Sequence, residues 1–431
     1  MISRISRLLA VTALVSLPMT AAFAQTTADK QAVIAGYADI AAATYGDALT
    51  TAKALQKAVE ALIATPSDET MKAARAAWIA SRPSYQQSEV YRFGNKIVDD
   101  WEGKVNAWPL DEGLIDYVDA GSYGEASDEN PSRTANIIAN PKVKVAGKNL
   151  DARKIDAKLL RRLHEAGGVE ANVATGYHAI EFLLWGQDLN GTGPGAGNRP
   201  WTDYAKDGCT NGHCDRRGQY LKAATDLLVS DLAWMVKQWG KDGKARQGLV
   251  KGRADNGIST MLTGMGSLSY GELAGERMKL GLMLHDPEEE HDCFSDNTHN
   301  SHYYDVIGIR NVYLGEYARA DGAPLKTASL SSLVAKADPA LDTEMKAKLE
   351  ATVAAMTTLK QRAETREAYD QMIGPNNPEG NAVVQAAIDA LTAQTRTLER
   401  VVASLKLKPI QVEGSDSLDD PAKVEAEKAK K

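Results

Sequence analysis

The segment Tyr220–Trp239, YLKAATDLLVSDLAWMVKQW, shows the pattern that decides the fold class. Its apolar residues recur at three- and four-residue spacing, which places them on one face of an α-helix. The same spacing, with abundant alanine and without runs of alternating β-branched residues, continues along most of the chain. The sequence therefore predicts an all-α fold. The apolar face of this first helix comprises Leu221, Ala224, Leu227, Leu228, Leu232, Met235, Val236 and Trp239.

Four more segments predict long helices, and breaks in composition divide the chain. Ser67 is suited to be the N-cap of one helix, because two acidic residues follow it directly. The predicted helices are Asp29–Ala64, Ser67–Arg92, Leu341–Ala368 and Asn381–Leu405. The predicted divisions are an N-terminal helical half at 25–190, a Gly-rich and two-cysteine loop at 191–217, a C-terminal helical half at 218–408 and a charged, disordered tail at 409–431.

Composition excludes several classes of protein. The chain has 431 residues, with 50 Lys and Arg against 57 Asp and Glu, and a net charge of −7. This acidic balance, without a basic block, argues against nucleic acid as a partner. An apolar fraction of 43% and a charged fraction of 25% are typical of globular proteins and exclude a disordered chain or one that crosses a membrane many times.

The N-terminus predicts export. Arg4 and Arg7 precede the apolar run Leu8–Leu17, and Ala22-Phe23-Ala24 forms a small-residue cleavage site. These features are typical of a signal peptide at 1–24. The style of the signal is bacterial, so we expect the mature chain in the periplasm, with a peripheral position at the outer membrane as one option, or outside the cell. We expect no transmembrane segment in it, because no later apolar run approaches the roughly 20 residues that a spanning helix needs.

The three cysteines agree with export. Cys209 and Cys214 lie close together in a polar loop, where an oxidising compartment would allow a local disulfide. Cys293 is then left as a buried free thiol or as an alternative partner, and a metal thiolate is the least favoured reading.

The sharpest local pattern is Gly176–Gly186, GYHAIEFLLWG, an apolar helix that contains one imidazole and one carboxylate. His178 and Glu181 are three residues apart and share a helix face, with Cβ atoms about 5–6 Å apart. Metal sites in helical proteins bind their ions through imidazole and carboxylate pairs at this spacing. A buried His–Glu hydrogen bond is the more common arrangement, so spacing alone leaves both interpretations open.

Four other regions concentrate groups that could act in a site. Cys293–Asp305 carries hydroxyls, amides, Asp296, His299 and His302, although part of it is also an ordinary helix-capping sequence. Glu89 and Arg92 end an early helix, and an exposed or Arg-paired carboxylate is the default for Glu89.

Glu272, Glu276 and Arg277 form a similar acidic helix before the second imidazole cluster, a weak hint of duplication. The acidic run Asp286–Asp292 could attract cations but is a solvated loop by default.

Neither standard zinc-peptidase pattern is complete. His164-Glu165 begins like His-Glu-x-x-His, but Gly168 stands where the second histidine belongs. After His178 and Glu181, Phe182 occupies the position at which the inverted motif needs a histidine.

The segment Gly176–Gly186 resembles the Gly-x-His-x-x-Glu signature of the imelysin family, in particular its iron-regulated protein A branch. The segments at 89–94, 106–112 and 293–299 are also similar to that family, so the resemblance covers roughly residues 30 to 405. It implies two bundle-like helical halves related by approximate duplication, with a pocket between them, and a bacterial envelope protein associated with iron supply. It marks Gly176, His178 and Glu181, with Glu89 and Arg92 as pocket partners.

We therefore expect a periplasmic, imelysin-like metal-binding protein whose cofactor is iron in preference to zinc. The expected ligands are His178, Glu181 and Glu89. The expected partners are the metal ion and other envelope components of iron uptake. Two alternatives stay open, namely a zinc-dependent metallopeptidase of the imelysin type and a protein that binds a non-metal ligand or serves as a scaffold. The other pocket candidates are Gly176, Arg92, Asp296, His299, His302 and Glu276.

Overall fold

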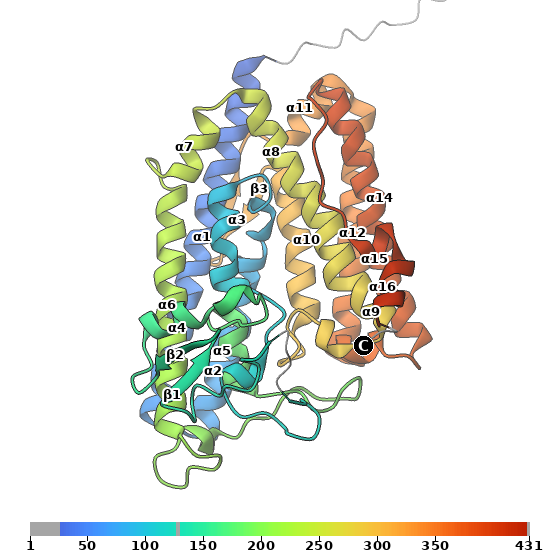
Figure 1. Cartoon of the computed structure of the whole chain (residues 1–431). Coiled ribbons are helices and arrows are strands. Elements are labelled where there is room, and N and C mark those ends of the chain that lie inside the picture. The colour runs from blue at the N-terminus through green and yellow to red at the C-terminus, as the bar shows by residue number, and fades with distance from the viewer. Residues whose placement is uncertain (1–25, 126–129, 429–431) are drawn as a thin grey trace, which may run out of the picture.

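The computed structural model describes residues 26–125 and 130–428, and it confirms the all-α prediction (Figure 1). The predicted signal peptide at 1–24 lies outside the described residues. The helices are α1 (Thr27–Ala64), α2 (Asp68–Gln86), α3 (Lys96–Asn106), α4 (Ala157–Leu163), α5 (Gly176–Trp185), α6 (Cys214–Trp239), α7 (Lys244–Val250), α8 (Ala254–Ser267), α9 (Leu280–Leu284), α10 (Thr298–Leu314), α11 (Leu330–Ala337), α12 (Pro339–Thr365), α13 (Tyr369–Ile373), α14 (Pro378–Ser404), α15 (Asp416–Asp419) and α16 (Pro421–Lys428).

Shorter elements connect these helices. A π-helical segment, η5 (Leu268–Lys279), joins α8 to α9, and the single turn η1 (Glu89–Tyr91) follows α2. Two antiparallel hairpins were not expected from the sequence, because each strand has only three or four residues. They pair β1 (Lys142–Val145) with β2 (Lys148–Asp151), and β3 (Glu316–Ala318) with β4 (Pro324–Lys326).

The first group of helices forms around α1, which packs against α2 and α6 (Figure 1). Thr26 and Asp29 form a capping box at the start of α1, in which each side chain accepts a hydrogen bond from the other residue's backbone at 3.1 Å. Aromatic rings fill the space between these helices, and Tyr45 stacks on Trp239 with ring centroids 6.4 Å apart. The predicted helix at Tyr220–Trp239 is the C-terminal part of the longer α6.

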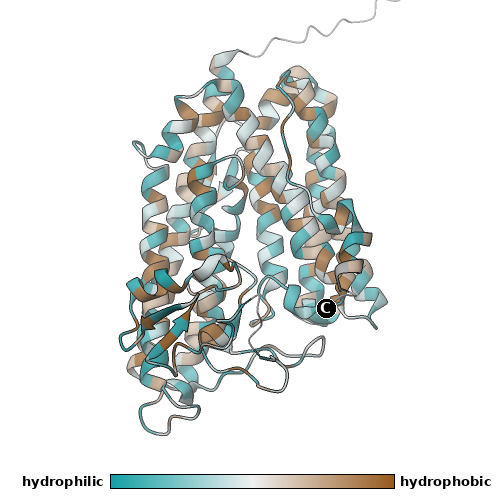
Figure 2. Cartoon of the chain, in the orientation of Figure 1, coloured by the Kyte–Doolittle hydropathy of each residue, from teal (hydrophilic) through white to brown (hydrophobic). Residues whose placement is uncertain are grey.

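The second group comprises α8, η5, α10, α12 and α14 (Figure 1). Within it α12 packs on α14 and α10, while η5 packs on α14. The two groups are joined where α10 packs on α2 and where α8 packs on α1. Apolar and polar residues are interspersed along the helices (Figure 2). None of the described helices has the length and the apolar composition needed to cross a membrane.

The segment after Pro409 differs from the disordered tail expected from its composition. The backbone N–H of Glu413 donates to Ser267 Oγ at 3.0 Å, and Ser417 Oγ donates to the Gly275 carbonyl at 3.0 Å. Backbone and hydroxyl hydrogen bonds to the helical segment at 254–284 therefore order a segment that has few large apolar side chains.

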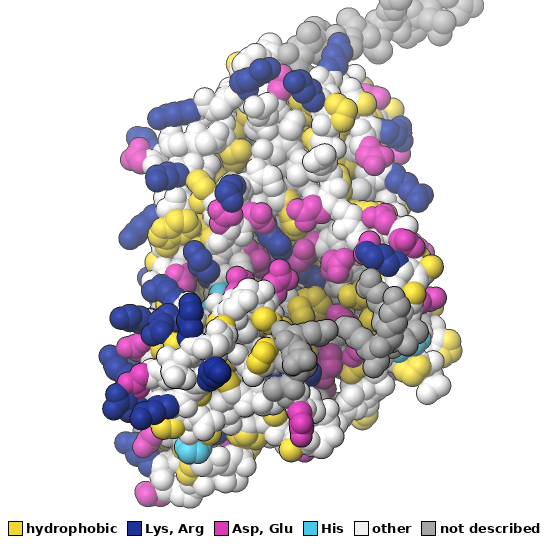
Figure 3. Space-filling model, in the orientation of Figure 1, with side chains coloured by type: hydrophobic (Ala, Val, Ile, Leu, Met, Phe, Trp, Pro, Cys, Tyr) yellow, Lys and Arg dark blue, Asp and Glu magenta, His cyan; other side chains and the backbone are white. Residues whose placement is uncertain are grey.

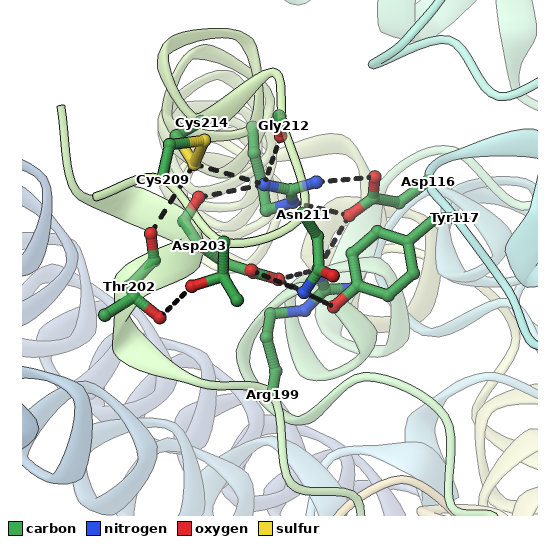
Figure 4. The surroundings of a disulfide bond; sticks show 11 residues. Asp116, Tyr117, Arg199, Thr202, Asp203, Cys209, Asn211, Gly212 and Cys214 are labelled. Carbon is green, nitrogen blue, oxygen red and sulfur yellow. Dashed lines mark hydrogen bonds and ion pairs between the residues drawn. A yellow bond between two sulfur atoms is a disulfide. The ribbon is translucent and has the colours of Figure 1, made fainter. Parts of the chain in front are cut away.

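A disulfide joins Cys209, in the loop before α6, to Cys214, the first residue of α6 (Figure 4). Cys293 is free. Arg217 anchors this loop, because its guanidinium donates to the Gly212 carbonyl at 3.0 Å and to Asp116 Oδ2 at 2.6 Å. The loop is thus tied covalently to the first residue of α6 and by hydrogen bonds to the first group of helices.

Candidate metal centre

Helix α5 places the Gly-x-His-x-x-Glu motif in the core, because all ten of its residues are buried. Gly176 begins the helix with φ +86°, and a Cβ there would lie 2.4 Å from the carbonyl oxygen of Val105. Only glycine fits this close approach of α5 to the end of α3. Trp78 of α2 holds the next residue, since its indole N–H donates to the Tyr177 carbonyl at 3.0 Å.

His178 and Glu181 contact each other as their spacing predicts, with 3.0 Å between Nδ1 and Oε2. The other carboxylate oxygen of Glu181 accepts hydrogen bonds from the backbone N–H and the hydroxyl of Ser295, at 3.0 and 2.6 Å. His178 Nε2 is buried and has no hydrogen-bond partner among the described residues. Glu181 therefore fixes the imidazole and leaves one of its ring nitrogens free.

The structure brings His291 and Asp292 to His178. One ligand atom of each of these three residues lies within 4.8 Å of the others, and all three residues are at most 1% exposed. The ring centroids of His178 and His291 are 4.7 Å apart. Nδ1 of His291 is buried and accepts or donates no hydrogen bond within the described chain. We call His178, His291 and Asp292 the metal centre.

Asp292 is held in its charged form. Arg82 donates to its Oδ1 at 2.9 Å, while Ser301 and Asn297 donate to its Oδ2 at 2.5 and 2.9 Å. Burial raises the pKa of Asp292, but the positive charge of Arg82 and the hydrogen bonds from Ser301 and Asn297 act together against it, and the pKa lies below the usual value. Arg82 is itself fixed by Asn106, whose side-chain oxygen accepts a hydrogen bond at 2.8 Å.

Both imidazoles of the metal centre are neutral. Burial, followed by the charge of Arg82, lowers the pKa of His178 to about 3. Burial, followed by the charge of Arg277, lowers the pKa of His291 well below its usual value. A neutral imidazole has a lone pair on one nitrogen and is the form that binds a metal ion. Two neutral imidazoles and one ionised carboxylate thus converge in the core.

Glu89 and Arg92 lie in a second buried cluster instead. Arg277 of η5 bridges Glu89 Oε2 at 2.8 Å, Glu272 Oε1 at 2.7 Å and Asp305 Oδ2 at 3.2 Å. We call this group, which includes the side chains of Arg92 and Glu102 beside Glu272, the ion-pair cluster.

The other predicted site residues are spread around these two groups. His302 is buried with both ring nitrogens unpartnered among the described residues, and its ring contacts Tyr369 edge-on at 5.2 Å. His299 lies 3.0 Å from Asn300 Nδ2, and Asp296 adopts a positive φ of 54°. Glu276 lines a separate cavity beside the C-terminal segment. None of these four is in the metal centre.

Arg82, His291 and Asp292 are not among the site residues predicted from the sequence. The run Asp286–Asp292 was expected to be a solvated loop, but the structure corrects this for residues 290–292, which are buried. They are buried because Asp292 pairs with Arg82 and His291 packs on Trp108, with ring centroids 5.7 Å apart. A signal for Arg82 did exist, since it shares the apolar face of α2 with Trp78 and Tyr85.

A cleft of about 580 Å³ adjoins the metal centre. Trp108 lines it and also contacts the His291 ring, so the same indole touches both the cleft and the metal centre. Residues of the loops at 108–123 and 187–191 line the cleft together with Glu288, Cys293 and Phe294. The approximate duplication of the two halves, and a pocket between them, stay predictions.

Comparison with known proteins agrees with this architecture. The imelysin family model matches residues 41–398, which include the whole metal centre. The chain is 23% identical over 386 residues to iron-regulated protein A of Synechococcus elongatus, covering 87% of this chain and 84% of that protein.

Two crystal structures share the fold. A protein of Parabacteroides distasonis described as an iron-regulated protein A precursor superposes with a TM-score of 0.63 at 19% identity, over 90% of this chain and 98% of that one. An imelysin-like protein of Psychrobacter arcticus superposes with a TM-score of 0.60 at 14% identity, over 89% and 98% of the two chains. Because the family match spans most of the chain, this protein belongs to the imelysin family.

Proposed function

We propose that this protein binds iron at the metal centre formed by His178, His291 and Asp292. The observation that carries the proposal is the convergence of their ligand atoms within 4.8 Å, with one buried, unpartnered nitrogen on each imidazole. Buried polar atoms are nearly always satisfied, so two free imidazole nitrogens beside an ionised carboxylate suggest that a cation completes the site.

The donor set suits iron. Two imidazoles and one carboxylate with open positions are typical of non-haem ferrous sites, and a similar set also holds catalytic zinc. Iron is favoured because the similar protein of Synechococcus elongatus carries the name iron-regulated protein A.

Glu181 and Arg82 would position the ligands. Ligating histidines commonly place their second nitrogen against a carboxylate, which is the relation of His178 to Glu181. Arg82 holds Asp292 in the same way from the other side. We leave Glu89 out of the proposed ligand set, because it lies in the ion-pair cluster with Arg277 and is not among the three residues whose ligand atoms converge within 4.8 Å.

The geometry favours binding over proteolysis. A peptidase must bring a peptide bond and a water molecule to its metal, with a free base beside them. Here the three ligands are at most 1% exposed, and both oxygens of Glu181 are engaged by His178 and Ser295. A metal ion can reach such a place, whereas a polypeptide would need a large rearrangement.

We also propose that the protein handles iron in the bacterial periplasm, together with other envelope components of iron uptake. The predicted signal peptide supports this location, as does the Cys209–Cys214 disulfide, which is typical of oxidising compartments.

The test is the metal content of the mature protein, purified from cells without metal-affinity steps and measured by mass spectrometry. We would compare the wild type with His178→Ala and His291→Ala, and with His213→Asn as an exposed-histidine control. About one iron per chain is expected in the wild type and the control. Either core variant should lose it while keeping its helical circular dichroism.

Other outcomes would overturn the proposal. Iron retained in a variant that lacks both His178 and His291 would place the metal elsewhere. Stoichiometric zinc, with chelator-sensitive cleavage of peptides, would favour the metallopeptidase. The absence of any metal from the wild type, even after incubation with ferrous iron, would favour a non-metal ligand or a scaffold.

A further inference from the structure

A small acidic cavity lies at the side of the cleft, apart from the metal centre. Its volume is about 10 Å³, which is close to the minimum that holds one water-sized particle, about 10–15 Å³. Five of its eight lining residues carry a carboxylate, and none of the eight is basic. The lining residues are Glu112, Asp188, Pro287, Glu288, Glu290, Cys293, Phe294 and Asp370.

Two of these carboxylates are buried, and neither one faces a basic side chain in this cavity. Glu290 is 1% exposed and Asp370 is 3% exposed. All four of their carboxylate oxygens lack a partner of ordinary hydrogen-bond geometry in the described parts of the chain. A buried carboxylate without a partner is costly, and two around one small cavity are more costly still. Protons or a bound cation would remove this cost.

The cleft gives a cation a route to this cavity. Glu112, Asp188 and Glu288 line both spaces, so the cavity borders the cleft of about 580 Å³. Arg133 also lines the cleft, but it lies over the Tyr123 ring at 4.4 Å and 3.5 Å from Asp111. Acidic side chains also gather across the middle of the face shown in Figure 3. A negative cleft concentrates cations at its floor.

We propose that Glu290 and Asp370 bind a second, hard divalent cation of the calcium or manganese class, which enters through the acidic cleft. Carboxylate oxygens are the donors that these ions prefer, whereas imidazoles suit iron and zinc. Outside the metal centre, no other three His, Cys, Asp or Glu ligand atoms of the described residues lie within 4.8 Å of one another. The two carboxylates hold the ion in the cavity, and water in the adjoining cleft completes its shell.

The test uses calcium alone as the probe, because calcium takes oxygen ligands and does not compete for imidazoles. Calcium binding to the full mature chain would be measured by isothermal titration calorimetry. The variants are Glu290→Gln, Asp370→Asn and the double variant, with Asp119→Asn as the matched control. Asp119 lines the same cleft, but its carboxylate already accepts hydrogen bonds from the backbone N–H groups of Gly121 and Ser122, at 3.0 and 2.9 Å.

We expect one calcium per chain in the wild type and in the control. Each single variant should weaken the affinity at least tenfold, and the double variant should bind none. Because these substitutions remove unpaired buried charges, the melting temperature without calcium should stay the same or rise, which shows that the variants fold. Calcium binding in the double variant within twofold of the wild type would overturn the proposal, as would a wild type that binds none at millimolar calcium.

A second comparison separates this site from the metal centre. His178→Ala should keep its calcium and lose its iron, while the double variant should keep its iron and lose its calcium. Loss of calcium from a folded His178→Ala protein would show that the two sites are one, and would overturn the proposal of a separate site.

Discussion

The metal centre and the ion-pair cluster are both buried groups of ionisable side chains, yet they are neutralised in different ways. In the ion-pair cluster, Arg277 alone contacts three carboxylates within 3.2 Å, so cations of the protein itself already occupy the positions that a metal would take. In the metal centre, Arg82 contacts Asp292, but the two imidazoles are neutral and each keeps a free nitrogen.

This difference indicates which buried carboxylates can bind a metal ion. Asp292 also pairs with a guanidinium, as the carboxylates of the ion-pair cluster do, so a guanidinium neighbour does not by itself distinguish the two groups. A carboxylate next to neutral imidazoles still has room for a cation, because imidazole supplies a lone pair and no charge. Buried acidic residues alone therefore do not identify a site, and the identity of their neighbours does.

The largest expected effect comes from breaking the ion-pair cluster. Arg277→Met leaves Glu89, Glu272 and Asp305 without their shared cation, and removal of one partner of a buried pair costs about 3–5 kcal/mol. Urea denaturation should show a loss of this size in the free energy of unfolding. The control is Arg246→Met, whose partner Asp39 is half exposed, and it should cost less than about 1 kcal/mol. Equal losses in the two variants would contradict the contrast.

A second prediction concerns metal-dependent stability. Iron at one hundred times its dissociation constant should raise the free energy of unfolding of the wild type by about 2.7 kcal/mol. His291→Ala should lose this gain, because it removes a proposed ligand. Glu89→Gln should keep it, since Glu89 belongs to the ion-pair cluster. Thermal melts with and without ferrous iron under anaerobic conditions measure both, and loss of the gain in Glu89→Gln would return Glu89 to the ligand set.

The smallest expected effect is the pH dependence of the ion-pair cluster. Burial, followed by repulsion from Glu89, raises the pKa of Glu102 from 4.5 to about 7. A raised pKa in the folded state means that the folded protein holds this proton more tightly. The resulting stability is fully present below pH 4.5 and is lost as the pH rises through 7. Between pH 5.5 and 7.5 this loss amounts to about 2 kcal/mol or less.

Glu102→Gln is the variant that tests this titration. Urea denaturation at the two pH values should show that the wild type loses more stability than Glu102→Gln does. Glu170→Gln, at an exposed position, is the control and should follow the wild type. A Glu102→Gln protein with the same pH dependence as the wild type would assign the titration to another group.

Much of the fold follows from local pattern, and the helix starts show why. The Ser67 cap was predicted from the acidic residues that follow it, and the structure shows its hydroxyl accepting from the Thr70 N–H at 3.2 Å. The hairpins and the ordered C-terminal segment were not predicted. The strands are too short to show a period, and the segment after Pro409 is ordered by hydrogen bonds to a distant part of the chain.

The contacts of the candidate site also fall into two kinds, those that the local sequence determines and those that only the packing determines. The sequence by itself determined the helices and the contact of His178 with Glu181, because neighbours three residues apart on a helix meet whatever surrounds them. Only the tertiary structure decided that Asp292 pairs with Arg82, 210 residues away, and that Glu89 pairs with Arg277, 188 residues away. Such partners are selected when helices from the two groups pack together, and no local periodicity records which distant charge a buried side chain will face.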